Sequence, residues 1–227
     1  MPADFIKRET ADGSDTLYSA RLGEAYHSLN GSLTESRHVF LEAGLHALHR
    51  KDVCVFEVGL GTGLNALLTW QAAVAENLTI TYHSIEAFPL DTALTSTLRF
   101  PLAAPNLPAN ALARLHAAPW DQPSALDSAF TLFKHQGDVL KFPFADYAPG
   151  YDLVYFDAFA PDIQPELWEE ALFRRLYDVM HAGGILVTYC AKGEVRRRLQ
   201  RAGFITERLP GPPGKREMLR ARRQNGE

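Results

Sequence analysis

The sequence predicts an α/β domain with a mostly parallel, doubly wound sheet and an N-terminal extension made of a hairpin and a helix. An apolar run at residues 53–58 leads into three alternating glycines and then into a helical pattern. Apolar runs and helical segments alternate along the rest of the chain. Strands that are apolar on both faces are typical of a parallel sheet covered by helices, and the alternation is typical of right-handed strand–helix–strand units.

Residues 1–50 are expected to form the N-terminal extension. Asp12 and Gly13 separate two short, partly apolar runs, and an Asp-Gly pair in that position predicts a hairpin. Apolar residues recur at helical spacing over residues 33–50. A hairpin and then a helix should therefore precede the sheet.

Residues 51–227 are expected to form the sheet domain, and both segments together one structural unit. The predicted strands are residues 53–58, 80–85, 130–135, 151–156 and 184–189, and the predicted helices are residues 64–70, 166–180 and 194–202. Five of the 14 prolines lie in residues 101–123, which predicts short helices and turns on the surface of the sheet.

The composition excludes several classes of protein. The chain has 227 residues, of which 46% are hydrophobic and 22% charged, values that exclude collagen-like and disordered chains. Apolar runs stay well below the about 18 residues of a membrane helix, and the N-terminus lacks a secretory apolar core. Cys54 and Cys190 lack the paired spacing of a zinc site. We therefore expect a cytoplasmic protein without a bound metal or a membrane partner.

The charge is distributed unevenly along the chain. Residues 190–227 contain eleven Lys or Arg and four Glu, a net charge of +7, which leaves −11 for the rest of a chain with a net charge of −4. An acidic body with a basic end suggests that a polyanion such as nucleic acid approaches one face. The alternative is a solvated helix face followed by a charged tail.

A glycine-rich segment after the first predicted strand indicates a nucleotide-like ligand. Gly59, Gly61 and Gly63 allow the backbone to approach a ligand closely, and the helix after them presents unpaired N–H groups. The third glycine of a dinucleotide fingerprint would be residue 64, which is Leu64. The acidic Glu57 before the glycines instead resembles the loop that binds S-adenosylmethionine in Rossmann-like methyltransferases.

Acidic residues follow three further strands of the predicted sheet. Glu86 comes 23 residues after Gly63, where a carboxylate accepts hydrogen bonds from both ribose hydroxyls. Asp138 follows the third strand and is a candidate acceptor for an adenine amino group, and Asp157 follows the fourth. Since ligands bind at the carboxyl ends of parallel strands, we expect these acids to share one site.

Six motifs together carry a resemblance to a known family. In chain order they are ESRHVF at 35–40, FEVGLGTGLN at 56–65, EAFPL at 86–90, FDAFAP at 156–161, PELW at 165–168 and KREM at 215–218. Residues 20–220 resemble the methyltransferase domain of the MnmC-type tRNA 5-methylaminomethyl-2-thiouridine biosynthesis proteins. The fold class that this resemblance implies is a Rossmann-like class I S-adenosylmethionine-dependent methyltransferase.

The resemblance implies N-methylation of the 5-aminomethyl group of (2-thio)uridine at the wobble position of tRNA. The cofactor would be S-adenosylmethionine, without FAD, because the flavin-dependent oxidase domain of the bifunctional members has no counterpart in this sequence. A separate enzyme would supply the aminomethyl group. The implied cofactor-binding residues are Glu57, Gly59, Gly61, Gly63, Asn65, Glu86, Asp138 and Asp157.

Asp157 is the candidate catalytic residue, because an amine must lose its proton before it attacks a methyl group. Further candidates lie in the region that the family folds over the cofactor, in the loop after Asp157, and in the basic end, where they would contact phosphates of the anticodon region. These candidate substrate-binding residues are Tyr26, His27, Glu35, Ser36, Phe159, Pro161, Lys192, Arg196, Lys215 and Arg216.

Three other functions stay open at this point. A transferase of the same fold acting on a small amine would suit the acidic body and would not require the basic end. A catalytically silent RNA-binding module would keep the fold without the chemistry. A dehydrogenase is disfavoured by Leu64, which interrupts the dinucleotide fingerprint.

Overall fold

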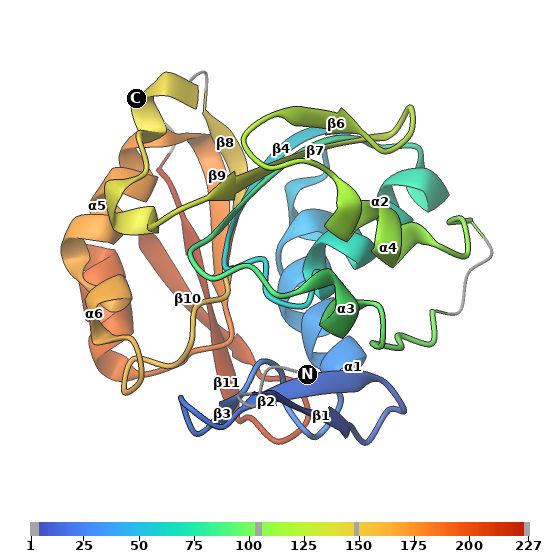
Figure 1. The fold of residues 1–227 in the computed structure, drawn as a ribbon. Helices are drawn as coiled ribbons and strands as arrows, with labels where there is room; N and C mark the ends of the chain where they lie inside the picture. The colour runs from blue at the N-terminus through green and yellow to red at the C-terminus, as the bar shows by residue number, and fades with distance from the viewer. Residues whose placement is uncertain (1–4, 103–105, 148–149, 225–227) are drawn as a thin grey trace.

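A computed structural model describes residues 5–102, 106–147 and 150–224 and shows two sheets (Figure 1). The small sheet is antiparallel, with the order β1-β2-β3, and the large sheet has the order β10-β11-β9-β8-β4-β5-β7-β6. In the large sheet β9, β8, β4, β5 and β7 run parallel, whereas β6 and β11 are antiparallel to their neighbours. The strands are β1 Phe5–Glu9, β2 Asp15–Ser19, β3 Glu24–Ala25, β4 Asp52–Val58, β5 Thr79–Glu86, β6 Pro123–Ala125, β7 Phe130–Gln136, β8 Tyr151–Phe156, β9 Met180–Thr188, β10 Ile205–Pro210 and β11 Glu217–Arg222.

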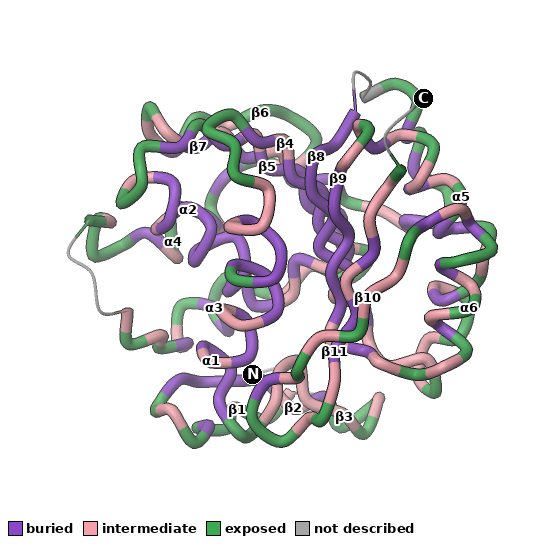
Figure 2. Tube along the Cα trace, turned by 180° about the vertical axis from the view of Figure 1, so that it is seen from behind, coloured by how far each residue is buried: buried purple, intermediate pink, exposed green. Residues whose placement is uncertain are grey.

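Helices cover both faces of the large sheet. The α-helices are α1 Ser32–Ser36, α2 Leu64–Glu76, α3 Thr92–Thr95, α4 Ala111–Ala117, α5 Glu170–Val179 and α6 Gly193–Arg201. Helices α2 and α4 lie on one side of the sheet and α5 and α6 on the other (Figure 1). The central strands are buried between these layers (Figure 2). Among the described residues, no helix is both long and apolar enough to cross a bilayer.

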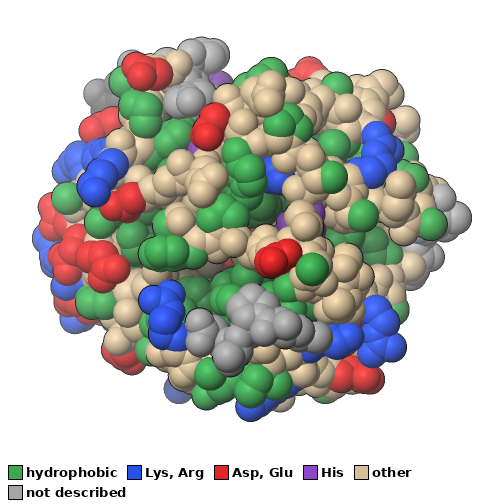
Figure 3. Space-filling view, in the orientation of Figure 1, with side chains coloured by type: hydrophobic (Ala, Val, Ile, Leu, Met, Phe, Trp, Pro, Cys, Tyr) green, Lys and Arg blue, Asp and Glu red, His purple; other side chains and the backbone are tan. Residues whose placement is uncertain are grey.

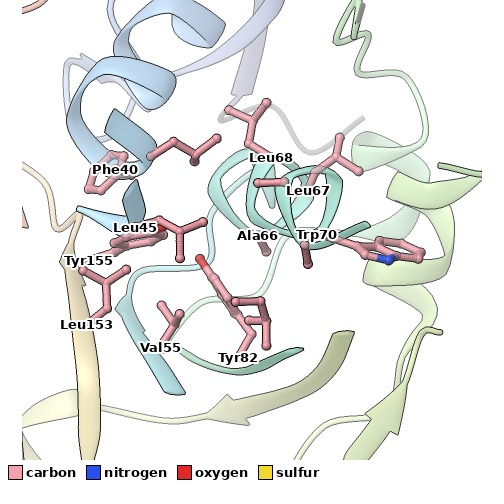
Figure 4. Packing of buried hydrophobic residues seen from close by; sticks show 14 of the residues in the cluster. Phe40, Leu45, Val55, Ala66, Leu67, Leu68, Trp70, Tyr82, Leu153 and Tyr155 are labelled. Carbon is pink, nitrogen blue, oxygen red and sulfur yellow. The ribbon is translucent and has the colours of Figure 1, made fainter. Parts of the chain in front are cut away.

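The N-terminal extension shares the hydrophobic core of the large sheet. Phe40 and Leu45 are buried in the same cluster as Val55 of β4 and Tyr155 of β8, and the Phe40 and Tyr155 ring centroids are 5.1 Å apart (Figure 4). Helix α2 adds Trp70 to this cluster. The extension is therefore packed onto the sheet rather than separated from it.

The strand order reverses beside β4. After β4 the chain moves to β5 and outward to β7, then returns to β8 on the other side of β4 and continues to β9. The carboxyl ends of β4 and β8 thus mark a topological switch point, the usual place for a ligand in an open α/β sheet. Asp157 and the glycine-rich segment follow these two strands.

Several predicted elements are confirmed, and others differ. The N-terminal hairpin and the five predicted strands of the parallel sheet are present, although β9 begins at Met180 rather than at residue 184. The continuous helix over residues 33–50 is wrong: α1 is followed by a π-helical segment, Arg37–Glu42, and a 3₁₀ turn, Leu45–Leu48. Between them the Gly44 backbone lies too close to the Phe40 carbonyl oxygen for any side chain.

The predicted helix over residues 166–180 is also divided. A 3₁₀ turn, Pro165–Trp168, precedes α5, which ends where β9 begins. The proline-rich segment contains α4, as expected for short helices and turns, but residues 103–105, with Pro105, lie outside the described residues.

The C-terminal hairpin of β10 and β11 was not predicted. Charged side chains interrupt its apolar pattern, and several of them pair across the strands. Arg220 and Arg222 both donate to Glu207, and Arg208 lies 3.4 Å from Glu217. Part of the basic end is therefore an ion-paired sheet surface.

Candidate active site

The glycine-rich segment forms a tight turn between β4 and α2. Gly59 and Gly61 have φ angles of +90° and +49°, which other residues rarely adopt. A Cβ atom on Gly59 would lie 3.0 Å from the Asp157 backbone oxygen, and one on Gly61 would lie 2.9 Å from Cδ1 of Tyr26. Glycine is therefore required at both positions, because the turn needs a positive φ and the neighbouring segments leave no room for a side chain.

A cavity of about 400 Å³ opens at this switch point. The size falls in the range of roughly 300–1,000 Å³ that is usual for small-molecule sites. Hydrophobic side chains gather in the central hollow of the face shown in Figure 3. The predicted site residues that line the cavity are Tyr26, His27, Glu35, Ser36, Gly59, Gly61, Asn65, Glu86, Asp138, Asp157, Phe159 and Lys215.

Glu86 and Asp138 lie at one end of the cavity. Glu86 accepts hydrogen bonds from the Gly61 N–H at 3.0 Å and the Phe88 N–H at 2.9 Å. A carboxylate has about four acceptor positions, so two remain for ligand hydroxyls. Asp138 accepts from the Leu140 N–H at 2.9 Å, so it caps a short turn while it also lines the cavity.

Asp157 stands in the middle of the cavity wall, directly after β8. The Asn65 side-chain amide donates to its Oδ2 at 2.8 Å. Burial, with Glu35 as the next cause, raises the pKa of Asp157 to about 7, although Asn65 and Lys215 act to lower it. A carboxylate with that pKa can hold or take a proton near neutral pH.

The other end of the cavity combines three carboxylates with one ammonium. Lys215 Nζ donates to Oε1 of Glu35 and lies 3.9 Å from the centroid of the Tyr189 ring. Glu35 also accepts from the Ser28 N–H at 2.8 Å. Glu24 contributes a buried oxygen without a hydrogen-bond partner among the described residues, and burial raises its pKa. With Asp157 nearby, this end favours a cationic group.

Aromatic rings close the cavity from the N-terminal side. Tyr26 and Phe159 meet edge to face with their centroids 5.0 Å apart. Burial, with Glu86 as a second cause, raises the pKa of Tyr26. His27 is held neutral because burial lowers its pKa to about 4, and its Nε2 lies 3.3 Å from the Thr62 hydroxyl. These residues form a neutral, ring-lined boundary to the charged end.

Sequence reasoning missed several residues of this site, among them Tyr189 and Glu24. Tyr189 donates to the Ala158 carbonyl at 2.9 Å and lines the cavity, as does Glu24. Tyr189 is the last residue of a predicted strand. A position at the carboxyl end of a strand is the signal that also identified Asp157. Glu24 shares the N-terminal segment with Tyr26 but lacked a motif of its own.

Other predicted residues lie outside the cavity lining, namely Glu57, Gly63, Pro161, Lys192, Arg196 and Arg216. Glu57 is fully buried on β4, where it accepts from the Ser84 hydroxyl at 2.7 Å. Burial raises its pKa to about 8, so it is mostly protonated at neutral pH. Its Oε1 has no hydrogen-bond partner among the described residues, and a contact of Glu57 with the cofactor stays a prediction.

The basic residues of α6 are largely paired with acids. Arg197 donates to Glu194 at 2.8 Å, and Arg201 donates to Glu170 at 2.7 Å. Lys192 donates to Asp162 at 2.5 Å. This pairing favours the interpretation of α6 as a salt-bridged, solvated face, whereas Lys215 points into the cavity.

The donor set fits S-adenosylmethionine. Glu86 would hold the ribose hydroxyls and Asp138 the adenine amino group, and the bare backbone at Gly59 and Gly61 leaves room for the amino-acid end. Asn65 is buried and its Oδ1 has no partner among the described residues, so it can accept from the ligand ammonium. Within the described ranges, no group of three potential metal ligands occurs.

Fold and site together define a Rossmann-like, class I S-adenosylmethionine-dependent methyltransferase fold. A family described as S-adenosyl-L-methionine-dependent methyltransferase matches residues 122–224. The chain is also 34% identical over 241 residues to the tRNA 5-methylaminomethyl-2-thiouridine biosynthesis bifunctional protein MnmC of Aromatoleum aromaticum, and 34% identical over 221 residues to that of Magnetococcus marinus. These matches cover 99% and 93% of this chain but only 36% and 33% of the two relatives.

Comparison with solved structures agrees with the sequence matches. The crystal structure of MnmC2 from Aquifex aeolicus matches with a TM-score of 0.78 and 25% identity, over 99% of this chain and 73% of that chain. Spermidine synthase from Thermotoga maritima shares the fold, with a TM-score of 0.60 at 12% identity, over 98% of this chain and 69% of that chain. The predicted resemblance to the methyltransferase domain of the MnmC-type proteins is confirmed.

Proposed function

We propose that this chain transfers a methyl group from S-adenosylmethionine to the 5-aminomethyl nitrogen of (2-thio)uridine at the tRNA wobble position. The observation that carries the proposal is that Asp157, with a pKa raised to about 7, lies in one cavity with the glycine turn and next to the end that contains Glu24 and Glu35. That end of the cavity suits a cationic amine. The names of the curated relatives supply the tRNA uridine as the substrate.

The chemistry follows from the charge of the substrate. S-adenosylmethionine, when bound, supplies a methyl group attached to a positively charged sulfur. A primary amine is a cation near neutral pH and must lose one proton before its lone pair can form the new N–C bond, as the methyl–sulfur bond breaks and its electron pair stays on the sulfur. Asp157 accepts that proton, and Asn65 holds its carboxylate in place. Glu35 and Glu24 attract the incoming cation, while Lys215 keeps the acidic end from becoming too negative.

Several predicted partners belong to this proposal. Lys192, Arg196 and Arg216 would contact phosphates of the anticodon region, and a separate enzyme would supply the aminomethyl group. Methyl transfer changes no oxidation state at the amine carbon, so the step calls for no FAD. A tRNA substrate places the reaction in the cytoplasm.

We also propose that residues 1–50 and 51–227 act as one unit. The first segment contributes Tyr26 and Glu35 to the cavity, and the second contributes the glycine turn and Asp157. The shared core of Phe40 and Tyr155 supports this arrangement.

The experiment is a single-turnover transfer of labelled methyl from S-adenosylmethionine to unfractionated tRNA from cells that lack this modification. Nucleoside mass analysis should find methylated 5-aminomethyluridine, whereas tRNA without the aminomethyl group should stay unlabelled. Tight cofactor binding without tRNA labelling would refute the proposal and favour a small-amine substrate.

A further inference from the structure

An exposed aromatic side chain stands beside the mouth of the cavity. Phe88 is 66% exposed, more than any other large hydrophobic residue among those the structure describes. The two residues before it, Glu86 and Ala87, line the cavity. An exposed ring at the rim of a binding site is a candidate contact for a ligand that extends beyond the cavity.

The loop around Phe88 is anchored, so its exposure is a fixed feature. The Phe88 N–H donates to Oε1 of Glu86 at 2.9 Å, and Pro89 restrains the next position. Leu90 then packs against a cluster that includes Leu17 and Leu94. The backbone is thus held on both sides, while the Phe88 ring faces solvent.

A cation from the N-terminal segment, Arg21, lies over this ring. The Arg21 Cζ is 5.6 Å from the centroid of Phe88. Arg21 is exposed and makes no ion pair with an acidic side chain in the described part of the chain. It precedes by three residues Glu24, which lines the cavity, as does Leu29 at 47% exposure. The ring, the cation and the apolar side chain therefore all belong to segments that line the cavity.

We propose that Phe88 and Arg21 form a stacking platform for a nucleotide adjacent to the target uridine. This inference rests on the proposed function. Proteins that take a base from a single-stranded loop commonly stack neighbouring bases on aromatic rings and guanidinium planes. The unpaired charge of Arg21 complements the phosphates beside such a base, whereas a small amine inside the cavity would not reach the rim.

The test uses an anticodon stem-loop RNA that carries 5-aminomethyluridine, with fluorescent 2-aminopurine in turn on each side of it. Phe88→Ala should raise the KM for this RNA about ten-fold and abolish the change in fluorescence on binding, because it removes a ring-to-base stack. Phe88→Trp should keep both. Arg21→Ala should raise the KM about three-fold, as loss of an exposed cation contact predicts.

Ile205→Ala is the matched control, because Ile205 is 54% exposed on β10 at the far edge of the large sheet. It should change neither KM nor fluorescence. Cofactor affinity should stay the same in every variant. A Phe88→Ala variant that binds RNA normally would overturn the platform, and one that binds cofactor more weakly would instead assign Phe88 to the cofactor.

The two proposals can fail separately in this experiment. Suppose that the protein without substitutions changes the 2-aminopurine fluorescence, that Phe88→Ala does not, and that no methyl group is transferred. The stacking platform is then supported and the proposed reaction is wrong. If the protein methylates the RNA without any effect of Phe88, the reaction stands and the platform fails. If it does neither, both proposals are wrong.

Discussion

The two walls of the cavity are built in different ways. One wall consists of the carboxyl ends of β4, β5 and β8, where Gly59 and Asp157 directly follow a strand and Glu86 is the last residue of one. The other wall joins distant segments: Glu35 on α1 accepts from Lys215, 180 positions later, in the turn between β10 and β11. The first wall is set by strand order, the second by long-range ion pairing.

This difference separates two tasks. The first wall, with its backbone turn and a carboxylate placed to bind ribose, is suited to binding a cofactor that many enzymes of one fold share. A network of charged side chains from outlying segments suits the recognition of one particular acceptor. Substitutions in the first wall should therefore reduce the affinity for the cofactor. Substitutions in the second wall should change the rate of methyl transfer to the amine. Asp157 lies where the walls meet.

The largest effect is expected for Asp157→Ala. The variant should lose roughly 10²–10⁴-fold in single-turnover rate, the usual contribution of a general base, while cofactor affinity changes little. In the unmodified protein the base form predominates above the pKa of about 7, so the rate should rise with pH through that region.

Asp157→Asn is the matched control for that prediction, because it keeps the shape and a hydrogen-bond acceptor without the proton-accepting group. It should be nearly as slow and should lose the rise with pH. Near-normal turnover by either variant would show that Asp157 neither takes the proton nor anchors the amine.

The next effect is expected at the glycine turn. Gly61→Ala places a Cβ 2.9 Å from the Tyr26 ring at a φ of +49°, so we expect cofactor affinity to fall about ten-fold, in line with about 1–2 kcal/mol for a left-handed residue. Calorimetric titration with S-adenosylmethionine measures it. Gly193→Ala is the control, since Gly193 lies outside the cavity lining and a Cβ there meets only the flexible Arg197 guanidinium at 3.4 Å. Equal losses in both variants would contradict the requirement for bare backbone at Gly61.

A smaller effect is expected for Lys215→Met. Lys215 lowers the pKa of Asp157, so its removal should move the rise of rate with pH to higher pH and slow the reaction several-fold at pH 7. Lys215→Arg should restore the profile. The pH dependence of single-turnover rates decides this, and an unchanged profile in Lys215→Met would instead place Lys215 on the RNA phosphates.

The smallest effects are expected on the basic surface. Arg216 is exposed, whereas Arg197 is held by Glu194. Arg216→Ala should reduce the slope of log affinity for tRNA against log salt by about 0.7–0.9, the value expected for one phosphate contact. Arg197→Ala should change the slope less. If both variants bind tRNA like the unmodified protein at every salt concentration, neither Arg216 nor Arg197 contacts the tRNA.

Much of the first wall could be predicted from the sequence. Buried parallel strands appear as continuous apolar runs, and a glycine or an acid after such a run must lie at one edge of the sheet. That logic placed Gly59, Glu86 and Asp157 correctly in the cavity. Glu57 lies outside the cavity lining, because a residue inside a strand can face the core as readily as a ligand, and its contact with the cofactor stays a prediction.

The second wall resisted prediction for a different reason. The hairpin of β10 and β11 carries alternating charges, and its apolar signal is weak. Pairing between residues far apart in sequence leaves no local pattern, so the Lys215 ammonium was expected on the surface with the other basic residues. Glu24 and Tyr189 were missed because they belong to the site only through tertiary contacts, which leave no pattern in the sequence.

The sequence by itself determined the class of fold, the segments that form the parallel strands and the cofactor edge, because local hydrophobic patterns and glycine conformations dictate them. Only the tertiary structure decided the charges around the amine site. There Glu35 is buried against Lys215, and a neighbouring carboxylate and burial together raise the pKa of Asp157 to about 7. Such a shift depends on distance and on loss of water, and both arise only when the segments fold together.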